Sequence, residues 1–218
     1  MKTLLMKAGL LALLLAVAFL LAACGSVGSG QQGDQSGGHG QMDHGQMDHG
    51  SMGMGSQGMA RQMVMENGKY SDRRFIDAMV PHHQGAIAMA EVALKNAEHE
   101  EIMELSRNII STQQAEIEEL KTIKREEFGT SQVPMEMSPQ QMRSMGMMMN
   151  PHHLAQSKPF DKAFIDAIIP HHQSAIYMAQ RAHEKSEIPE IKDLAENIVS
   201  AQKREIEQMK QWRKQWYS

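Results

Sequence analysis

The chain has 218 residues, and its 22 Lys and Arg stand against 26 Asp and Glu, which gives a formal net charge of −4 at pH 7. This acidic balance excludes a protein that binds nucleic acid through a basic surface. The single cysteine excludes an internal disulfide framework. Methionine is the outlier of the composition, with 21 residues, and it is not a common residue of ordinary domains.

Residues 1–23 have the pattern of a bacterial secretion signal. Lys2 and Lys7 flank the apolar run 10–21, and Leu-Ala-Ala-Cys follows at 21–24. This order is typical of a lipoprotein signal peptide that is cleaved before Cys24. A simple secretory peptide and a membrane anchor are the alternatives, although the run is short for a spanning helix. We predict a lipidated Cys24, a cell-envelope location facing the periplasm or the exterior, and no thiolate left for a metal or for catalysis.

Residues 24–69 predict a disordered tether. They are rich in Gly, Ser, Gln, Met and His and almost lack aliphatic residues, so they cannot bury a core. Met-Asp-His-Gly occurs at 42–45 and again at 47–50. The repeats offer flexible metal ligands at Met42, His44, Met47 and His49. A linker without ligands is the alternative.

Two predicted helices follow, at residues 72–98 and 100–127. Ser71 or Asp72 can cap the first, and its apolar residues recur at spacings of three and four. Pro81 either kinks this helix or starts it after a separate turn. Residues 128–158 predict a loose linker that prolines interrupt. The linker carries further flexible ligands at Met145, Met147, Met148, Met149, His152 and His153.

The helix pair then recurs. FIDAMVPHHQGAIAMA at 75–90 returns as FIDAIIPHHQSAIYMA at 164–179, at an offset of 89 residues. This predicts helices at about 161–186 and 189–216, with Pro189 in a first turn. The repeats 70–127 and 159–218 are αα-hairpins that each have one apolar face and bury it against the other. We therefore predict an all-α protein, a single antiparallel and ferritin-like four-helix bundle, and no strand.

The repeated histidine pairs predict a metal site that is formed twice. Imidazole with thioether, without thiolate, suits copper, above all Cu(I) and secondly Cu(II); zinc gains little from methionine. Ile168 stands where the first copy has Met79, so the two sites should differ. Hydrogen-bonded core histidines are the alternative. The predicted ligands are Met79, His82, His83 and Met89, followed by His171, His172 and Met178.

Four carboxylates are predicted to support the histidines. A buried carboxylate needs a partner and can orient a ligating imidazole. The alternatives are a Glu–His or Glu–Arg pair that sets the register of the helices, and aspartates that cap the turn broken by proline. These carboxylates are Asp77, Glu116, Asp166 and Glu205.

The pattern PHHQ-x-AI-x-MA, followed by a helix with Q-x-x-EI, resembles the domain of unknown function 305 family. The resemblance covers about residues 70–127 and 159–217. It implies a ferritin-like helical bundle and, from members similar to secreted copper-resistance proteins, copper binding through the motif residues named above.

These features predict an extracytoplasmic, lipid-anchored copper-binding protein that buffers, sequesters or delivers copper and is not an enzyme. Its expected partners are copper ions, the membrane and a copper-transport protein, with no nucleic acid. One alternative is a ferritin-like metal-dependent oxidase. Di-iron bundles use Glu-x-x-His, whereas the second helix of each repeat carries Gln-x-x-Glu. The other alternative is a metal-free helical scaffold at the cell surface.

Overall fold

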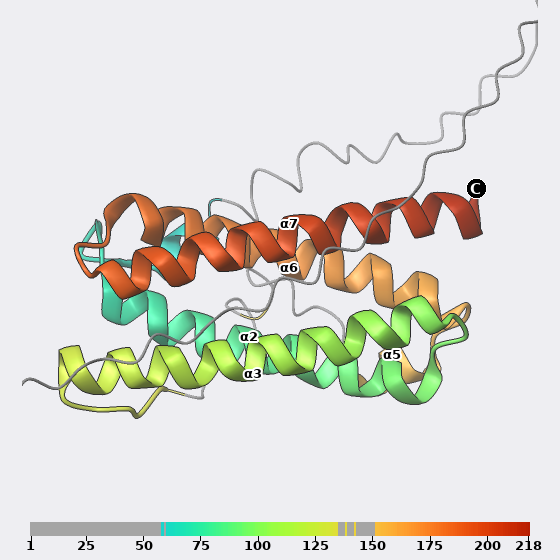
Figure 1. The fold of residues 1–218 in the computed structure, drawn as a ribbon, viewed down its shortest axis with the longest axis horizontal. Helices are drawn as coiled ribbons and strands as arrows, with labels where there is room; N and C mark the ends of the chain where they lie inside the picture. Colours follow the sequence, from blue (N-terminus) through green and yellow to red (C-terminus); the bar gives the residue numbers. More distant parts are fainter. Residues whose placement is uncertain (1–57, 59, 135–137, 139–141, 143–150) are drawn as a thin grey trace, which may run out of the picture. The chain divides into compact units, whose positions relative to one another are not determined.

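The computed structural model describes residues 58, 60–134, 138, 142 and 151–218. Helix dominates this part of the chain (Figure 1), which confirms the all-α class. Each of the four predicted helices ends within two residues of its expected limits. The long helices are α2 (Asp72–Asn96), α3 (Glu100–Phe128), α6 (Phe160–Lys185) and α7 (Pro189–Tyr217). The shorter elements are α5 (Pro151–Gln156), β1 (Met65–Glu66) and β2 (Lys69–Tyr70).

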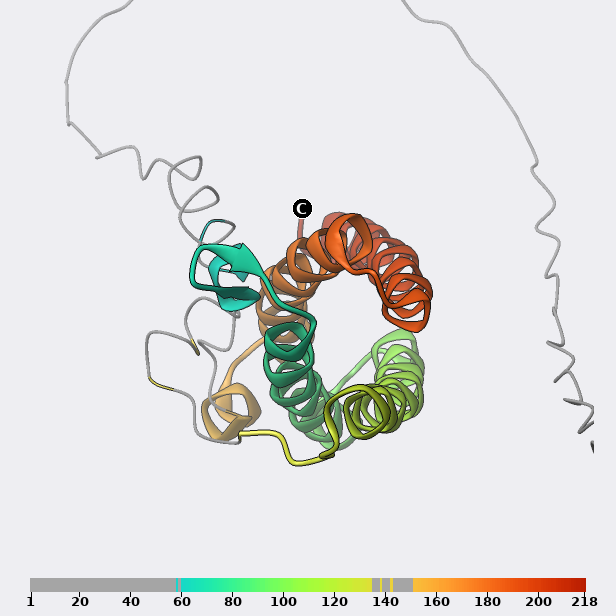
Figure 2. The same ribbon diagram turned by 90° about the vertical axis from the view of Figure 1, so that its left-hand side faces the viewer.

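The long helices form two hairpins that pack together. Helix α2 lies along α3, α6 lies along α7, and α2 packs against α6, whereas α3 and α7 contact each other only slightly. Figure 2 looks along the bundle and shows α2 beside α6 at the junction of the two hairpins. The bundle therefore joins the two repeats through the helices that carry the Pro-His-His-Gln motif. Its specific likeness to ferritin stays a prediction.

Local signals account for the helix ends. The hydroxyl of Ser71 caps α2 by accepting from the backbone N–H of Arg74 at 3.3 Å, as the sequence predicts. Helix α2 continues through Pro81, so a separate turn before the proline is wrong. Helix α3 ends at Gly129, whose φ of 70° lies in the left-handed region that glycine adopts without strain.

The prediction that the chain has no strand is wrong at residues 65–70. Met65 pairs with Tyr70 and Glu66 with Lys69 in an antiparallel hairpin. Asn67 and Gly68 form its turn with φ values of 51° and 76°. Positive φ at both central residues is typical of the tight turn that Asn-Gly favours. The dipeptide was therefore a readable signal for this hairpin.

Among the described residues, the folded part begins earlier than the sequence predicts and includes helical segments outside the four predicted helices. Ala60 and Val64, in the stretch assigned to the tether, are 0 % exposed and join the core. In the stretch assigned to the loose linker, Pro151 begins the short helix α5 and Leu154 is 0 % exposed. Within the described residues, no helix combines the length and hydropathy that a membrane crossing requires.

The core consists of two apolar clusters. The first cluster includes Phe75, Met79, Leu120, Met178 and Leu194. The second cluster includes Met89, Ile109, Phe164, Ile168 and Met209. On every long helix, buried polar residues stand between the stretches that supply the two clusters. We call this set the polar layer: His82, His83, Gln113, Glu116, His171, His172, Ser174, Gln202 and the half-buried Glu205.

Candidate metal centre

The first histidine of each motif meets the other in the polar layer. His82 on α2 and His171 on α6 have ring centroids 3.8 Å apart and planes inclined by 41°. Both residues, and the neighbouring His83 and His172, are 0 % exposed. The sequence predicts one site in each repeat. The structure instead brings the histidines of both repeats into one layer at the contact of α2 with α6.

Each repeat contributes one half of the polar layer, the first half with His82 and His83 and the second with His171 and His172. One hydroxyl distinguishes the two halves. Ser174 Oγ lies 2.7 Å from His82 Nε2 and donates to the backbone carbonyl of His171 at 2.7 Å. Because the hydroxyl has one hydrogen, its oxygen accepts from His82 Nε2. At the offset of 89 residues, Ser174 corresponds to Gly85. The serine therefore positions His82, and glycine supplies no hydroxyl for His171.

The second histidine of each motif meets a glutamate from the partner helix. His172 Nε2 and Glu205 Oε2 are hydrogen-bonded at 2.7 Å. The matching atoms of His83 and Glu116 approach to 2.8 Å, although they are not aligned as a hydrogen bond. The His172–Glu205 hydrogen bond is the kind of contact by which a carboxylate orients a ligating imidazole, and Glu116 lies in the matching position beside His83. A pair that merely sets the register of the helices would make the same contacts.

The two aspartates contact cations and not the histidines. Asp77 forms an ion pair with Lys124, which is 1 % exposed. Asp166 accepts from Lys162 at 2.6 Å and from Arg213 at 2.5 Å. Burial would raise the pKa of Asp166, but the hydrogen bonds and charges of Arg213 and Lys162 lower it below its usual value. At the offset of 89 residues, Asp166 corresponds to Asp77 and Arg213 to Lys124. Each aspartate therefore links the two helices of its own hairpin through an ion pair.

The polar layer holds more hydrogen-bonding capacity than the described side chains use. Both ring nitrogens of His171, Nδ1 of His83 and of His172, Oε1 of Gln113 and both amide atoms of Gln202 have no hydrogen-bond partner there. Buried polar atoms in proteins are nearly always partnered, and each that is not costs about 1–3 kcal/mol. These atoms leave hydrogen-bonding capacity in the layer for a further group, and imidazole nitrogens are the most numerous among them.

Burial sets the protonation state of His171. Removal from water lowers its pKa well below the usual 6.5, and the neighbouring His82, His172 and His83 lower it further, against a smaller opposite effect of the His82 backbone. The ring is therefore neutral near pH 7. Neutral imidazole is the form that coordinates a metal.

The methionines divide between the two sides of the layer. Met79 and Met178, which belong to different repeats, lie together in the first cluster. Met89 lies in the second cluster with Ile168. Met79 and Met89, which the sequence predicts as ligands of one site, therefore belong to different apolar clusters, and their role as ligands stays a prediction. Met209 of the second cluster is also 0 % exposed and was not among the predicted ligands, because it lies on the partner helix, outside both the repeated motif and the Met-rich segments.

The predicted flexible ligands fall into two groups. His152 and His153 lie exposed on α5, with ring centroids 6.2 Å apart. Within the described part of the chain, no three His, Cys, Asp or Glu side chains lie close enough to hold a metal ion. The remaining predicted residues lie outside the described residues: Cys24, Met42, His44, Met47, His49, Met145, Met147, Met148 and Met149.

The chain belongs to the domain of unknown function 305 family, whose sequence profile matches residues 21–124 and 121–213. Among solved structures it is similar to CopM in the Cu(II)-bound form, at 42% identity and a TM-score of 0.63, over 68% of this chain and 99% of that chain. It is also similar to CopM in the Cu(I)-bound form, at 40% identity and a TM-score of 0.61, over 69% of this chain and 100% of that chain.

A more distant likeness supports the fold alone. A DUF305 fragment from Deinococcus radiodurans is 24% identical with a TM-score of 0.58, over 64% of this chain and 92% of that chain. The search of curated proteins gave no match.

Proposed function

We propose that this chain is an extracytoplasmic copper-binding protein that holds copper in the polar layer and buffers, sequesters or delivers it. The observation that carries the proposal is His171. Its neutral ring is fully buried and packs on His82 at 3.8 Å, and among the described residues neither of its nitrogens has a partner in full hydrogen-bond geometry, although the His82 backbone is close enough to affect its pKa. The similarity to CopM, solved with Cu(I), Cu(II) and silver, supports copper as the ion.

The donor set favours Cu(I). Imidazoles of His82 and His171 lie between clusters that contain only buried thioethers as further metal donors. Soft thioether and imidazole ligands select Cu(I). In this proposal Met79, Met178 and Met89 supply sulfur from the two sides of the layer. Glu116 and Glu205 orient His83 and His172 through the contacts described above.

The experiment is an anaerobic Cu(I) titration against a competing chelator, with wild type and His171→Gln. Glutamine keeps a polar side chain at this position but removes the imidazole. We expect the tightest site to weaken by about tenfold or more, the range seen when a supporting group of a metal site is lost. The matched control is the double variant His152→Gln and His153→Gln on the exposed α5, which should keep that affinity. Unchanged binding in His171→Gln would contradict the proposal and favour a metal-free scaffold.

The oxidase alternative is tested in the same samples. Copper-loaded or iron-loaded wild type is supplied with a reductant, and oxygen consumption is measured. A binding protein should show the background rate of the free metal. Catalytic turnover that disappears in His171→Gln would replace binding by catalysis as the function of the layer.

The proposed location rests on the N-terminal signal. Lipid at Cys24 would hold the bundle at a membrane through the Met- and His-rich tether. One acyl chain binds a membrane only marginally, so stable anchoring requires several chains. Cys24→Ser should leave the protein unprocessed or release it from the membrane fraction. If Cys24→Ser is processed and fractionates like wild type, the proposed lipid anchor is contradicted, whereas the proposal of copper binding is unaffected.

A further inference from the structure

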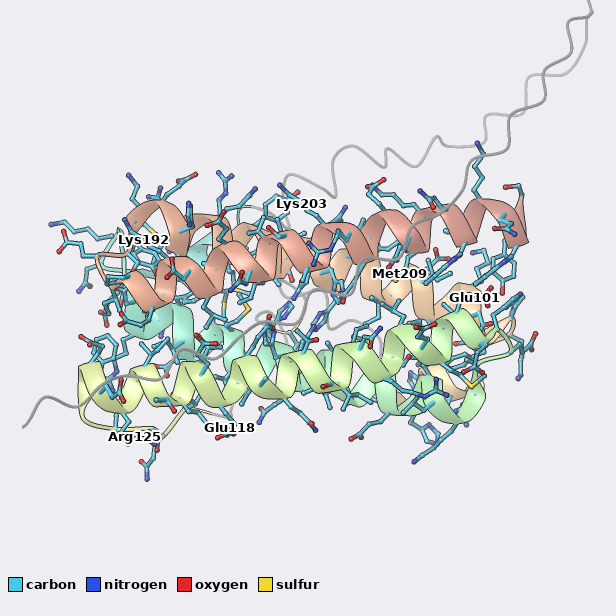
Figure 3. All side chains as sticks on the ribbon, in the orientation of Figure 1. Glu101, Glu118, Arg125, Lys192, Lys203 and Met209 are labelled. Atoms are coloured by element: carbon cyan, nitrogen blue, oxygen red, sulfur yellow. The ribbon has the colours of Figure 1, made fainter. Side chains whose placement is uncertain are left out.

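Two exchanges between the repeats lie next to the polar layer. At the offset of 89 residues, Met79 on α2 corresponds to Ile168 on α6, and Leu120 on α3 corresponds to Met209 on α7. All four side chains are 0 % exposed. Thus one repeat has its methionine on the histidine helix, and the other has it on the partner helix. Figure 3 labels Met209 on α7, in the half toward the C-terminus.

The helix geometry places each exchanged pair at one height. Glu205 contacts His172, so these residues are level on the antiparallel helices α7 and α6. Four residues further along α7 is Met209, and four residues back along α6 is Ile168. With a rise of 1.5 Å per residue, both lie about 6 Å from that level, on the same side. The contact of Glu116 with His83 places Leu120 and Met79 in the same way.

The cluster assignments agree with this geometry. Met79 and Leu120 belong to the first cluster. Ile168 and Met209 belong to the second. Each half of the polar layer therefore has one thioether within about one helical turn, supplied by α2 in the first half and by α7 in the second.

We propose that Met209 is a soft-metal ligand of the second half of the layer and takes the place that Met79 holds in the first. The proposal rests on the copper-binding function and deepens it. It assigns to the second half a thioether and imidazole donor set for a soft monovalent cation, Cu(I) or Ag(I). The second half can then bind the ion although it has Ile168 where the first half has Met79, because Met209 supplies the thioether.

Core packing alone would also preserve the volume at these positions. The first repeat has Met79 with Leu120, and the second has Ile168 with Met209. The two pairs have similar volumes, and volume-conserving swaps of this kind are well tolerated. Stability measurements therefore do not separate a ligand from a filler. Affinity for a soft ion does, because leucine replaces the volume of methionine but not its sulfur.

The test is a titration of the full processed chain with Ag(I) and, without oxygen, with Cu(I). Met209→Leu should weaken one soft-ion equivalent by about tenfold or more, with a thermal unfolding midpoint close to wild type. Adding Ile168→Met to Met209→Leu should restore the affinity, because it returns a thioether to the same level from α6. The matched control is Met103→Leu, at a half-buried position of α3 outside both clusters, which should bind as wild type.

The outcomes separate this assignment from the function on which it rests. If Met209→Leu keeps both affinities while Met79→Leu and His171→Gln lose them, Met209 is a core residue and the assignment is overturned. A double variant that fails to regain affinity also overturns it. If all three single variants bind as wild type, the layer does not hold the ion and both proposals fall.

Discussion

The imidazole rings of His82 and His171 pack at 3.8 Å although the residues stand 89 positions apart in the chain. The same offset relates the two repeats, so the contact joins equivalent residues across a pseudo-twofold arrangement. Two cationic rings at this distance in a buried layer would repel each other, because the effective dielectric constant there is low. The two rings are therefore not both protonated, and burial makes His171 the neutral one by lowering its pKa well below the usual value.

Acid should destabilise the metal-free protein through His171. Its pKa in the folded chain is well below 6.5, whereas in the unfolded chain the ring takes up a proton near about pH 6.5. The unfolded state thus binds more protons as the pH falls, and the free energy of unfolding decreases from about pH 6.5 down to the folded-state pKa.

The loss has a maximum slope of about 1.4 kcal/mol per pH unit for one proton. Urea denaturation of wild type and His171→Gln at about pH 7.5 and about pH 5.5 measures it. We expect a smaller decrease in the glutamine variant. An equal decrease in both proteins would show that His171 is protonated in the folded state.

The ion pairs of the two hairpins should differ in their effect on stability. Lys124 is 1 % exposed beside Asp77, whereas Arg213 is 44 % exposed beside Asp166. Breaking a buried pair leaves an uncompensated charge and costs about 3–5 kcal/mol, whereas an exposed pair contributes about 0.2–1 kcal/mol.

Lys124→Met and Arg213→Met are therefore matched variants at equivalent positions of the two repeats. Chemical denaturation should show a large loss of unfolding free energy for the first and a small loss for the second. Similar losses in both would mean that water reaches Asp77 once Lys124 is removed.

Deletions in the N-terminal segment should separate the tether from the bundle. Removing residues 26–57 should lower the number of weakly held copper ions and leave the tightest site unchanged, because its ligands lie in the helices. Extending the deletion to residue 68 should also lower the melting temperature, since it removes the buried Ala60 and Val64 and most of the hairpin. Copper stoichiometry and thermal unfolding measure the two effects. Loss of the tightest site in the shorter deletion would move that site into the tether.

One hairpin by itself should not form a stable monomer. Residues 58–134 alone would expose His82, which packs on His171 of α6, and would remove the residues of the second repeat from the clusters of Met79 and Met89. We expect this fragment to be poorly folded or to form a dimer that reproduces the contact between the repeats. Circular dichroism and analytical ultracentrifugation test this. A cooperatively unfolding monomer would show that each repeat has a sufficient core of its own.

The positions of the long helices were predictable because their signals are local. The spacing of apolar residues, the cap at Ser71 and Pro189 in a first turn act over one or two helical turns. Two further local signals were present in the sequence but were not used in the prediction. The Asn-Gly turn of the β1–β2 hairpin and the proline that begins α5 are equally local signals, and a composition rich in Gly, Met and His concealed them.

The sequence by itself determined most of the residues that form the polar layer. The duplicated Pro-His-His-Gln motif and the Gln-x-x-Glu of the partner helices marked all but one of the residues of the polar layer, since a repeat is visible without any coordinates. Ser174 was not marked, because its importance lies in a hydrogen bond to His82 in the other repeat.

Only the tertiary structure decided how these residues are grouped. The pairing of His82 with His171, the association of Met79 with Met178, and the level of Met209 depend on the register of α2 against α6 and of each helix against its hairpin partner. That register follows from the packing of whole helix faces over many residues. Helical periodicity predicts which face is buried, but not which residue of another helix lies opposite it.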